Sequence, residues 1–356
     1  MKQKLIFTNL VGETIDTLVA DLGNPAVVVI SDTGTANAVL PVLENDSKSI
    51  ASAGKITVPS GDTNKNLDSL THIWNRLSEM EATRSTVVVN LGGGVVGDMG
   101  GFAAATFKRG MRCINVPTTL LAAVDASVGG KTAINFNGMK NQIGVFAEPE
   151  AAVISTVFFN TLPEQEILSG YAEMLKHALL ENEEVLARLL AYSPVYPVFD
   201  SEALLPLLRE SVMVKRRIVA TDLTEQGIRK ALNLGHTVGH AFESLAMERK
   251  SPVPHGYAVA WGMVVELILS HMKLQFPSDT LQKFAAYIRD NYGVFNIDCK
   301  DYPALLAGMR QDKKNASPDK INFTLLKGVG EPVIDSIATP DEIKSALDIY
   351  RDLMGI

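Results

Sequence analysis

The sequence has little cysteine, no excess of positive charge and no long apolar run. Its two cysteines, Cys113 and Cys299, exclude a disulfide framework and favour a reducing, cytoplasmic compartment. The net charge of −7 argues against a binder of nucleic-acid backbones, although not against a local pocket for a small anion. We expect no membrane span, because no run approaches the necessary length, and no signal peptide, because only a short apolar run follows Met1–Lys4.

Hydrophobic residues make up 46% of the 356 positions, enough to bury two domains. In the first half, β-branched runs alternate with helical periods, which predicts a parallel sheet covered by helices on both faces. The predicted strands are 26–31, 55–58, 86–91, 113–116 and 152–154, and the clearest helix is 67–80, with Asn66 as its N-cap.

Beyond residue 162 nearly every long segment has a helical period. The predicted helices are 164–190, 202–219, 232–247, 258–272 and 281–292, with one strand at 321–326. Thr161 is the candidate cap of the first of these helices, with Pro163 in its first turn. The pattern predicts an α/β half up to residue 162 and a mostly helical half from 163 to 356. A site that uses both halves would lie in the cleft between them.

The most concentrated polar pattern is the stretch from Arg229 to His240. His236 and His240 are four apart, so on a helix they project from one face. That spacing suits two imidazoles that share a metal, or one ligand beside an acid–base group. Arg229 and Asn233 would continue the same stripe, which makes a poor packing face. The alternative is an ordinary solvated helix.

A glycine-rich turn connects the strand 86–91 to a helical segment that runs through Phe107. Gly92, Gly94 and Gly97 satisfy G-x-G-x-x-G, whose glycines let a backbone approach a pyrophosphate at a helix N-terminus. The acidic residue expected about twenty positions later is missing, and Asp32 is the better candidate for a ribose. The pattern predicts a dinucleotide in a modified layout, with a glycine turn for packing alone as the alternative.

Gly129-Gly130-Lys131-Thr132 looks like the end of a phosphate-binding P-loop. The full motif needs a glycine at position 125, where this chain has Asp125. A nucleoside triphosphatase is therefore rejected. Lys131 still qualifies as a contact for a substrate phosphate or carboxylate.

Taken together, these blocks resemble the 3-dehydroquinate synthase family of sugar phosphate cyclases, from about Asp32 to Lys314. The motifs that carry the resemblance are 92–98, 108–110, 116–122, 124–133, 140–141, 172–177, 232–240 and 254–256. The resemblance implies a Rossmann-like N-terminal domain that binds NAD and a helical domain that binds a divalent metal, zinc or cobalt, and the substrate. It also implies a cytoplasmic enzyme of the shikimate pathway, commonly a homodimer.

The activity implied is conversion of 3-deoxy-D-arabino-heptulosonate 7-phosphate to 3-dehydroquinate and phosphate. Family members oxidise the C5 hydroxyl with NAD, eliminate phosphate, reduce the ketone again and close the ring by an intramolecular aldol addition. The net reaction is redox-neutral. The matching metal ligands are Glu173, His236 and His255, which corrects the idea of His240 as a ligand and leaves it for proton transfer.

Two further sets of residues follow from the resemblance. The substrate and proton-transfer positions are Arg109, Asp125, Lys131, Asn141, Lys176, Lys215, Glu225, Arg229, Asn233, His240 and Lys313 or its neighbour Lys314. The NAD positions are Asp32, Asp62, Lys65, Gly93, Gly94, Val95, Asp98, Thr118, Thr119, Lys131, Lys140, Phe158 and Thr161. Arg109 is a candidate contribution from a partner subunit, Glu225 alternatively pairs with Arg229 on a helix face, and Phe158 alternatively belongs to the core.

Asp62, Gly34 and Tyr257 depart from the residues usual in the family, and we expect them to affect cofactor affinity rather than the chemistry. Two rival functions remain. One is a cyclase acting on sedoheptulose 7-phosphate or glucose 6-phosphate, which would not need the carboxylate partners Lys215, Arg229 and Asn233. The other is a polyol oxidoreductase similar to glycerol dehydrogenase, which would release NADH stoichiometrically. A metal-binding scaffold without catalysis would not need all these sets together.

Overall fold

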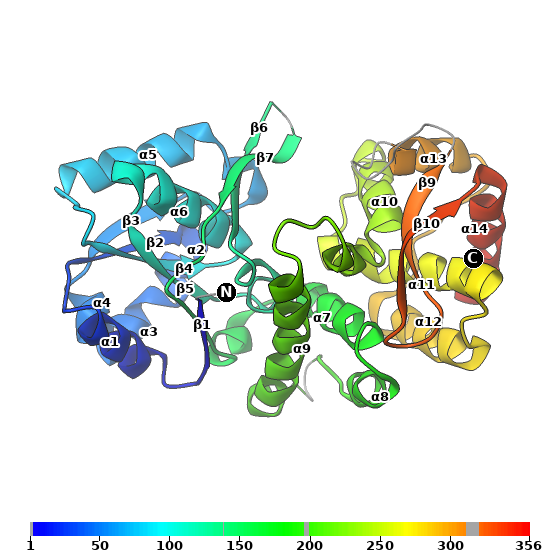
Figure 1. Cartoon of the computed structure of the whole chain (residues 1–356), viewed down its shortest axis with the longest axis horizontal. Coiled ribbons are helices and arrows are strands. Elements are labelled where there is room, and N and C mark those ends of the chain that lie inside the picture. The colour runs from blue at the N-terminus through cyan, green and yellow to red at the C-terminus, as the bar shows by residue number, and fades with distance from the viewer. Residues whose placement is uncertain (1–2, 138, 196–198, 311–319) are drawn as a thin grey trace. The chain divides into compact units, whose positions relative to one another are not determined.

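The computed structural model describes residues 3–137, 139–195, 199–310 and 320–356. The chain divides into two compact units, which are described separately (Figure 1). The first unit comprises Met1–Pro163 and Asp200–Val212, and the second comprises Glu164–Phe199 and Met213–Ile356.

The first unit is built on a six-stranded sheet with the order β1-β8-β5-β4-β2-β3, whose neighbouring strands run parallel. The strands are β1 Lys4–Phe7, β2 Val27–Asp32, β3 Gly54–Val58, β4 Val87–Gly92, β5 Arg112–Pro117 and β8 Ala151–Ile154. The helices are α1 Val11–Asp21, α2 Thr33–Ala38, α3 Leu40–Asp46, α4 Lys48–Ala51, α5 Leu67–Glu79 and α6 Gly94–Thr106. Short helical turns are η1 Asp62–Asn64, η2 Phe107–Arg109, the π-helical η3 Ala122–Ala126, and η4 Val157–Thr161.

Helices cover both faces of this sheet, as the sequence predicts. Figure 1 shows α5 and α6 on one side and α1, α3 and α4 on the other. The runs of valine in β2 and β4 are buried because each strand packs against helices above and below. Val28 and Val88, for example, share a core with Ile73 of α5 and Met99 of α6.

Asp32 and the glycine turn lie at one edge of the sheet. β2 pairs with β3 on one side and with β4 on the other, and the strand order reverses there. Ser31 is in register with Leu91, so the carboxyl ends of β2 and β4 are level. Open parallel sheets bind ligands at such a reversal, outside the carboxyl ends of the strands.

An antiparallel hairpin, which the sequence analysis did not predict, also belongs to the first unit. It consists of β6 Lys131–Phe136 and β7 Met139–Phe146. Every described residue of β7 is exposed, and Phe146 has 63% of its surface accessible. A strand with so many accessible apolar side chains is unusual.

The second unit is mostly helical, as predicted. Its helices are α7 Glu164–Leu179, α8 Glu183–Ala191, the later part of α9 Ser201–Thr221, α10 His236–Glu248, α11 His255–Leu274, α12 Ser278–Tyr292, α13 Tyr302–Arg310 and α14 Pro340–Met354. The 3₁₀ turn η5 Ile228–Asn233 precedes α10, and the strands β9 Ile321–Leu326 and β10 Pro332–Ala338 form an antiparallel pair.

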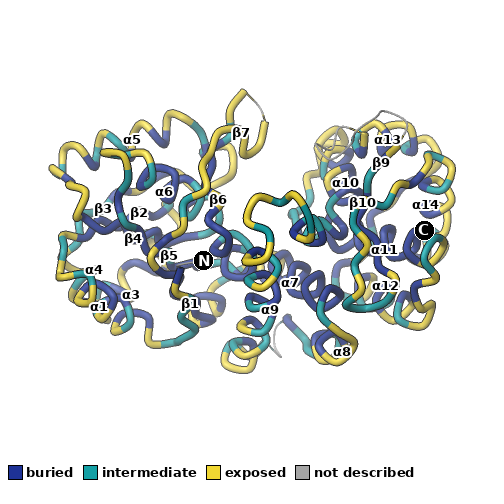
Figure 2. The backbone as a smooth tube through the Cα atoms, in the orientation of Figure 1, coloured by how far each residue is buried: buried dark blue, intermediate teal, exposed yellow. Residues whose placement is uncertain are grey.

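α11 is the central helix of this unit. Buried residues run along it from Gly256 to Ser270, and Figure 2 shows it in dark blue. It is long and apolar enough to cross a membrane, contrary to the expectation that no run approaches that length, but most of its apolar window is buried inside the unit. A helix that is apolar on all sides occurs both as a membrane span and in the core of a large protein. Here α7, α10, α12 and α14 pack around α11.

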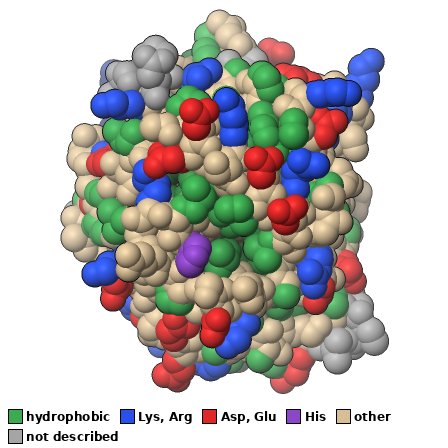
Figure 3. All heavy atoms as spheres, turned by 90° about the vertical axis from the view of Figure 1, so that its right-hand side faces the viewer, with side chains coloured by type: hydrophobic (Ala, Val, Ile, Leu, Met, Phe, Trp, Pro, Cys, Tyr) green, Lys and Arg blue, Asp and Glu red, His purple; other side chains and the backbone are tan. Residues whose placement is uncertain are grey.

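Some predicted boundaries are wrong. The predicted helix 164–190 is two helices, because Asn182 caps the start of α8. Thr161 is not the N-cap of α7, since the helix begins at Glu164 and Thr161 is the last residue of η4. On the face of the second unit drawn in Figure 3, acidic and basic side chains are interspersed among apolar ones.

Candidate functional site

Three helices of the second unit each contribute one of the proposed metal ligands. Glu173 lies in α7, His236 is the first residue of α10, and His255 is the first residue of α11. The start of α11 approaches α7 closely because position 256 is glycine: a Cβ there would overlap the carbonyl oxygen of Ser169. Ser169 also accepts the backbone N–H of Gly256 through its hydroxyl, at 3.1 Å.

The side chains of these three residues converge. His236 Nε2 lies 3.5 Å and His255 Nε2 lies 3.8 Å from the same carboxylate oxygen of Glu173, Oε1. One ligand atom from each residue lies within 4.8 Å of the others. Glu173 is 1% exposed, whereas the histidines are partly accessible, so a metal held here would be reachable from solvent.

The second ring nitrogen of each histidine is held by another group. His236 Nδ1 lies 3.1 Å from the carbonyl oxygen of Leu234, and His255 Nδ1 lies 3.2 Å from Glu243 Oε2. If each Nδ1 carries the proton, each Nε2 presents a lone pair towards Glu173. Metal-binding histidines have this arrangement. Two imidazoles and one carboxylate are also the donor set of a catalytic zinc site with open positions, so the residues fit a divalent metal.

His240 lies beside this group. Its ring centroid is 5.5 Å from that of His236 and 5.9 Å from that of His255. His240, Glu243 and His255 form a second group whose ligand atoms lie within 4.8 Å of one another. The first group fits a metal better than the second, because in the second the Glu243 carboxylate holds the Nδ1 of His255 and His240 is exposed.

Two proposed substrate lysines are buried in the same unit. Lys176 forms an ion pair with Glu173 one turn earlier in α7, and both residues are almost completely buried. Lys215 of α9 has 6% of its surface accessible. Buried ammonium groups are costly unless they have partners, and Glu173 is such a partner for Lys176.

Of the proposed residues, Glu225 lies on the loop before η5, and Arg229 and Asn233 lie within η5, so the predicted helical stripe is not formed. Gly235 has a φ of +80°, and α10 begins only after it. Glu225 has a φ of +61°, so it does not share a regular helix face with Arg229, which was the alternative reading of this residue. Glu225 also accepts from the Asn233 amide at 3.0 Å.

Asp222 organises this loop. Its Oδ2 accepts the backbone N–H groups of Gly227 and Arg229, at 2.7 and 3.1 Å, and its Oδ1 accepts that of Gln226 at 3.1 Å. The Gly227 bond is the main cause that lowers the pKa of Asp222. Arg229 is 2% exposed, and its guanidinium donates to the carbonyl oxygen of Leu223 at 2.6 Å.

In the first unit, several proposed cofactor residues meet at the carboxyl edge of the sheet. Asp32 caps α2: its Oδ1 accepts the N–H groups of Gly34 and Thr35, at 2.8 and 3.0 Å. Thr118, directly after β5, donates its N–H to the carbonyl oxygen of Gly92 at 3.0 Å. A Cβ added at Gly93 would lie 3.3 Å from Thr119, so the glycine turn and the threonines touch.

Gly94 and Val95 open α6, whose first turn contains no acidic residue. The first N–H groups of a helix have no partner within it, and the helix dipole favours an anion there. A helix start of this kind suits the pyrophosphate of a dinucleotide.

Lys65 links the loop after β3 to both α6 and the hairpin. It is 4% exposed, lies 2.6 Å from Asp98 Oδ2 in an ion pair, and also bonds to the Asn141 side chain. Asp62, in the same loop, accepts from the Asn135 amide and lies 3.9 Å from Lys140 Nζ. These residues are brought together although they are far apart in the sequence.

The remaining proposed residues have diverse surroundings. Arg109 is exposed at the end of η2 with a φ of +65°, and Lys131 is exposed at the start of β6. Asp125 lies in the π-helical η3, a feature frequent at functional sites. Phe158 is buried and Thr161 exposed on η4. Lys313 and Lys314 lie outside the described residues.

The sequence analysis missed three carboxylates that bind the backbone or side chains of the candidate site: Asp222, Glu243 and Glu266. Glu266 gave a readable signal, because it interrupts an apolar run, Val264-Val265-Glu266-Leu267-Ile268. Asp222 and Glu243 gave no such signal, since an acidic residue on a loop or a helix surface is common.

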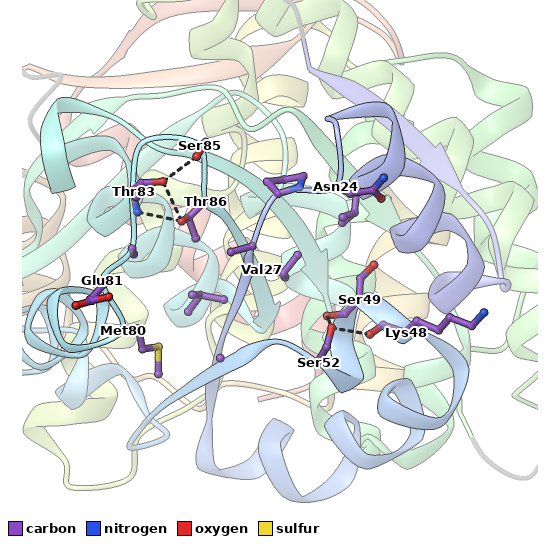
Figure 4. A pocket seen from close by; sticks show the side chains of 16 residues that line it. Asn24, Val27, Lys48, Ser49, Ser52, Met80, Glu81, Thr83, Ser85 and Thr86 are labelled. Atoms are coloured by element: carbon purple, nitrogen blue, oxygen red, sulfur yellow. Dashed lines mark hydrogen bonds between the residues drawn. The ribbon is translucent and has the colours of Figure 1, made fainter.

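A cavity of about 540 Å³ lies elsewhere in the first unit (Figure 4). Its lining includes Val27, Gly54 and Thr86, at the amino ends of β2, β3 and β4. That edge is opposite the glycine turn. The cavity is therefore not the dinucleotide position that the topology indicates.

Comparisons with known proteins agree with the resemblance seen in the sequence. Residues 55–169 match the model of the 3-dehydroquinate synthase N-terminal family, and residues 170–315 match that of the 3-dehydroquinate synthase C-terminal family. A 3-dehydroquinate synthase from Parabacteroides distasonis is 45% identical over 355 residues, covering 100% of this chain and 99% of the relative.

Two solved structures show the same fold. A 2-deoxy-scyllo-inosose synthase complexed with carbaglucose-6-phosphate, NAD+ and Co2+ has a TM-score of 0.82 at 24% identity, covering 96% of this chain and 95% of its own. A 2-epi-5-epi-valiolone synthase from Streptomyces hygroscopicus with NAD+ and Zn2+ has a TM-score of 0.84 at 21% identity, covering 98% and 97%.

Proposed function

The chain belongs to the 3-dehydroquinate synthase family, and we propose that it converts 3-deoxy-D-arabino-heptulosonate 7-phosphate to 3-dehydroquinate and phosphate with NAD and a divalent metal. The observation that carries the proposal is the convergence of His236 Nε2 and His255 Nε2 on Glu173, with each Nδ1 held by another group. This donor set suits zinc or cobalt.

The cofactors supply the chemistry that side chains lack. When bound, NAD takes up and returns a hydride, and the metal acts as a Lewis acid on substrate hydroxyls. Asp32, the glycine turn, Thr118 and Thr119 would hold NAD at the carboxyl edge of the sheet. Lys65, paired with Asp98 and Asn141, would fix the adjacent loop, and Asp62 and Lys140 would flank it.

The protein residues would bind the two anionic groups of the substrate and move protons. Lys215, Arg229 and Asn233 would bind the carboxylate, and Lys131, Asn141 and Lys176 the phosphate or hydroxyls. His240, which is exposed beside the two proposed ligand histidines, would exchange a proton with solvent, and Glu225 is the second candidate. Elimination of phosphate follows oxidation, because a ketone at C5 acidifies the proton on C6.

The test supplies this substrate with catalytic NAD and Co2+ or Zn2+ and follows phosphate release. We expect release without net NADH, abolished by a chelator and by His236→Ala. His72→Ala is the matched control, since His72 is an exposed histidine on α5. Full activity of His236→Ala would remove the metal assignment.

The same assay separates the rival functions. Release from sedoheptulose 7-phosphate, with none from the heptulosonate, would assign the chain to another class of sugar phosphate cyclase. NADH accumulating with a polyol would indicate an oxidoreductase. The presence of the matching set Lys215, Arg229 and Asn233 favours the heptulosonate, because these residues would bind a substrate carboxylate.

We also propose a cytoplasmic homodimer. Both cysteines are free, one buried and one exposed, which suits a reducing compartment. The β6–β7 hairpin exposes Phe136, Met139, Ile143, Val145 and Phe146, an apolar surface that a second copy of the chain would cover. Sedimentation equilibrium tests the dimer, and a monomer at assay concentration would contradict it.

A further inference from the structure

Glu266 is an acidic residue in the middle of the most apolar helix of the protein. It is 0% exposed, and its neighbours Val265 and Leu267 are equally buried. Burying a carboxylate is expensive unless hydrogen bonds replace its water. Its partners therefore show what the residue does.

The carboxylate of Glu266 binds the N-terminus of another helix. Oε2 accepts the backbone N–H of Gly235 at 2.6 Å, and Oε1 accepts that of Val238 at 3.2 Å. Gly235 is the N-cap residue of α10 and has no side chain to cap it. Glu266 thus supplies, from α11, the acceptors and the negative charge that a helix N-terminus favours.

The two helices are also in close contact at this point. A Cβ on Gly235 would overlap the Met263 side chain and lie 2.8 Å from the carbonyl oxygen of Val259, both in α11. The start of α10 therefore has little freedom to shift along α11. His236 lies between the two N–H groups that Glu266 binds, and His255 begins the helix to which Glu266 belongs.

We propose that Glu266 is a positioning residue for the metal centre: it fixes the start of α10 on α11, so that the imidazoles of His236 and His255 present Nε2 to the same carboxylate. This inference rests on the proposed metal-dependent function. Glu266 does not bind the metal itself. Glu266 acts through the backbone N–H groups before and after His236. It thereby sets the distance between His236 and His255.

The test compares metal affinity and thermal stability in Glu266→Gln. The variant loses the charge and turns one acceptor into an NH₂ group that would face a backbone N–H. We expect Co2+ and Zn2+ to bind about 10–100-fold more weakly in competition with a chromogenic chelator. The visible absorption spectrum of bound Co2+ should also change, since it reports ligand geometry.

Ser270→Ala is the matched control. Ser270 lies one turn further along α11 and is 0% exposed. Its hydroxyl donates to the carbonyl oxygen of Glu266 and accepts the N–H of Leu326, and neither bond involves α10. Ser270→Ala should lower the melting temperature and leave metal affinity unchanged. Should Glu266→Gln fail to fold, Glu266→Asp, which keeps the charge but is one methylene shorter, takes its place with the same expected direction.

Wild-type affinity and Co2+ spectrum in the folded Glu266 variant would overturn the proposal and leave Glu266 a purely structural residue. If the wild-type protein itself binds neither metal, the proposed function fails instead. The two failures are therefore distinguishable.

Discussion

Glu243 Oε2 lies 3.2 Å from Nδ1 of His255, the ring nitrogen opposite the one that faces Glu173. Glu243 belongs to α10, whereas His255 begins α11, so this contact joins two of the helices that carry the proposed metal ligands. The carboxylate holds the proton on Nδ1 and thereby keeps the lone pair on Nε2. Glu243 thus sets the tautomer that a metal ligand requires.

Glu243→Gln should therefore weaken metal binding without removing a ligand. A glutamine can still accept through its carbonyl oxygen, but it no longer stabilises the positive charge that the imidazole gains on coordination. We expect about 10-fold weaker binding, and up to about 100-fold for Glu243→Ala, measured by chelator competition. Glu248→Gln, an exposed position at the end of the same helix, is the control. Equal affinities in all variants would contradict the role.

Asp222 gives a prediction about pH. Its pKa is lowered, chiefly by the backbone N–H of Gly227, so the carboxylate stabilises the folded loop when ionised. A lowered pKa means that this stabilisation is present above the pKa of the unfolded chain, about 4, and is lost as pH falls through the lower folded value. Asp222→Asn lacks the charge at every pH.

The difference in unfolding free energy between wild type and Asp222→Asn should therefore be greatest near neutrality and shrink below about pH 4. Urea unfolding over a pH series measures it. The variant should also have a higher KM for the heptulosonate, because Asp222 accepts the backbone N–H of Arg229 and so holds this residue in place. If the difference in unfolding free energy stayed constant down to about pH 2, the charge of Asp222 would not contribute to stability.

Replacing Lys65 should weaken the binding of NAD more than the binding of the substrate. Lys65→Met breaks the ion pair with Asp98, whose side chain is 19% exposed, and removes a cation from beside this carboxylate. We expect unfolding free energy to fall by about 3 kcal/mol and NAD to bind more weakly, as measured by calorimetry. Lys55→Met, which breaks a more exposed pair with Glu44, should cost at most about 1 kcal/mol and leave NAD binding unchanged. Unchanged NAD affinity in Lys65→Met would contradict the assignment of this lysine.

The sequence predicted the elements whose signals are local. β2 and β4 were found because β-branched runs are typical of strands buried on both faces. The start of α5 was found because Asn66 accepts the N–H of Ser69, as an N-cap does. The hairpin β6–β7 was missed because the exposed strand β7 lacks the alternation that predicts a half-buried sheet.

The site was less predictable, because its contacts join distant segments. The spacing of His236 and His240 correctly indicated neighbouring rings, but nothing local shows that Gly235 interrupts the helix. Glu173 and His255 were nominated only by resemblance to a family, since they meet His236 through the packing of three helices. Glu243 and Glu266 act on ligands rather than on substrate, and no motif marks them.

Arg109 offers a test of how the subunits cooperate, if the protein is the proposed dimer. It is exposed, and its φ of +65° places it in a tight turn at the end of η2. The hypothesis is that it completes the substrate site of the partner subunit. Arg109→Ala and His236→Ala homodimers should each be inactive or nearly so.

Mixing the two inactive variants under conditions that allow subunit exchange shows whether Arg109 acts in its own subunit or in the partner subunit. If Arg109 acts across the interface, each heterodimer contains one site with both residues intact and one site with neither. Random exchange at equal concentrations makes half of the dimers mixed, so activity should recover to about one quarter of wild type. If Arg109 acts within its own subunit, every site in the mixture carries at least one defect and activity should not recover. Replacing His236→Ala by His72→Ala in the same mixture controls for simple dilution.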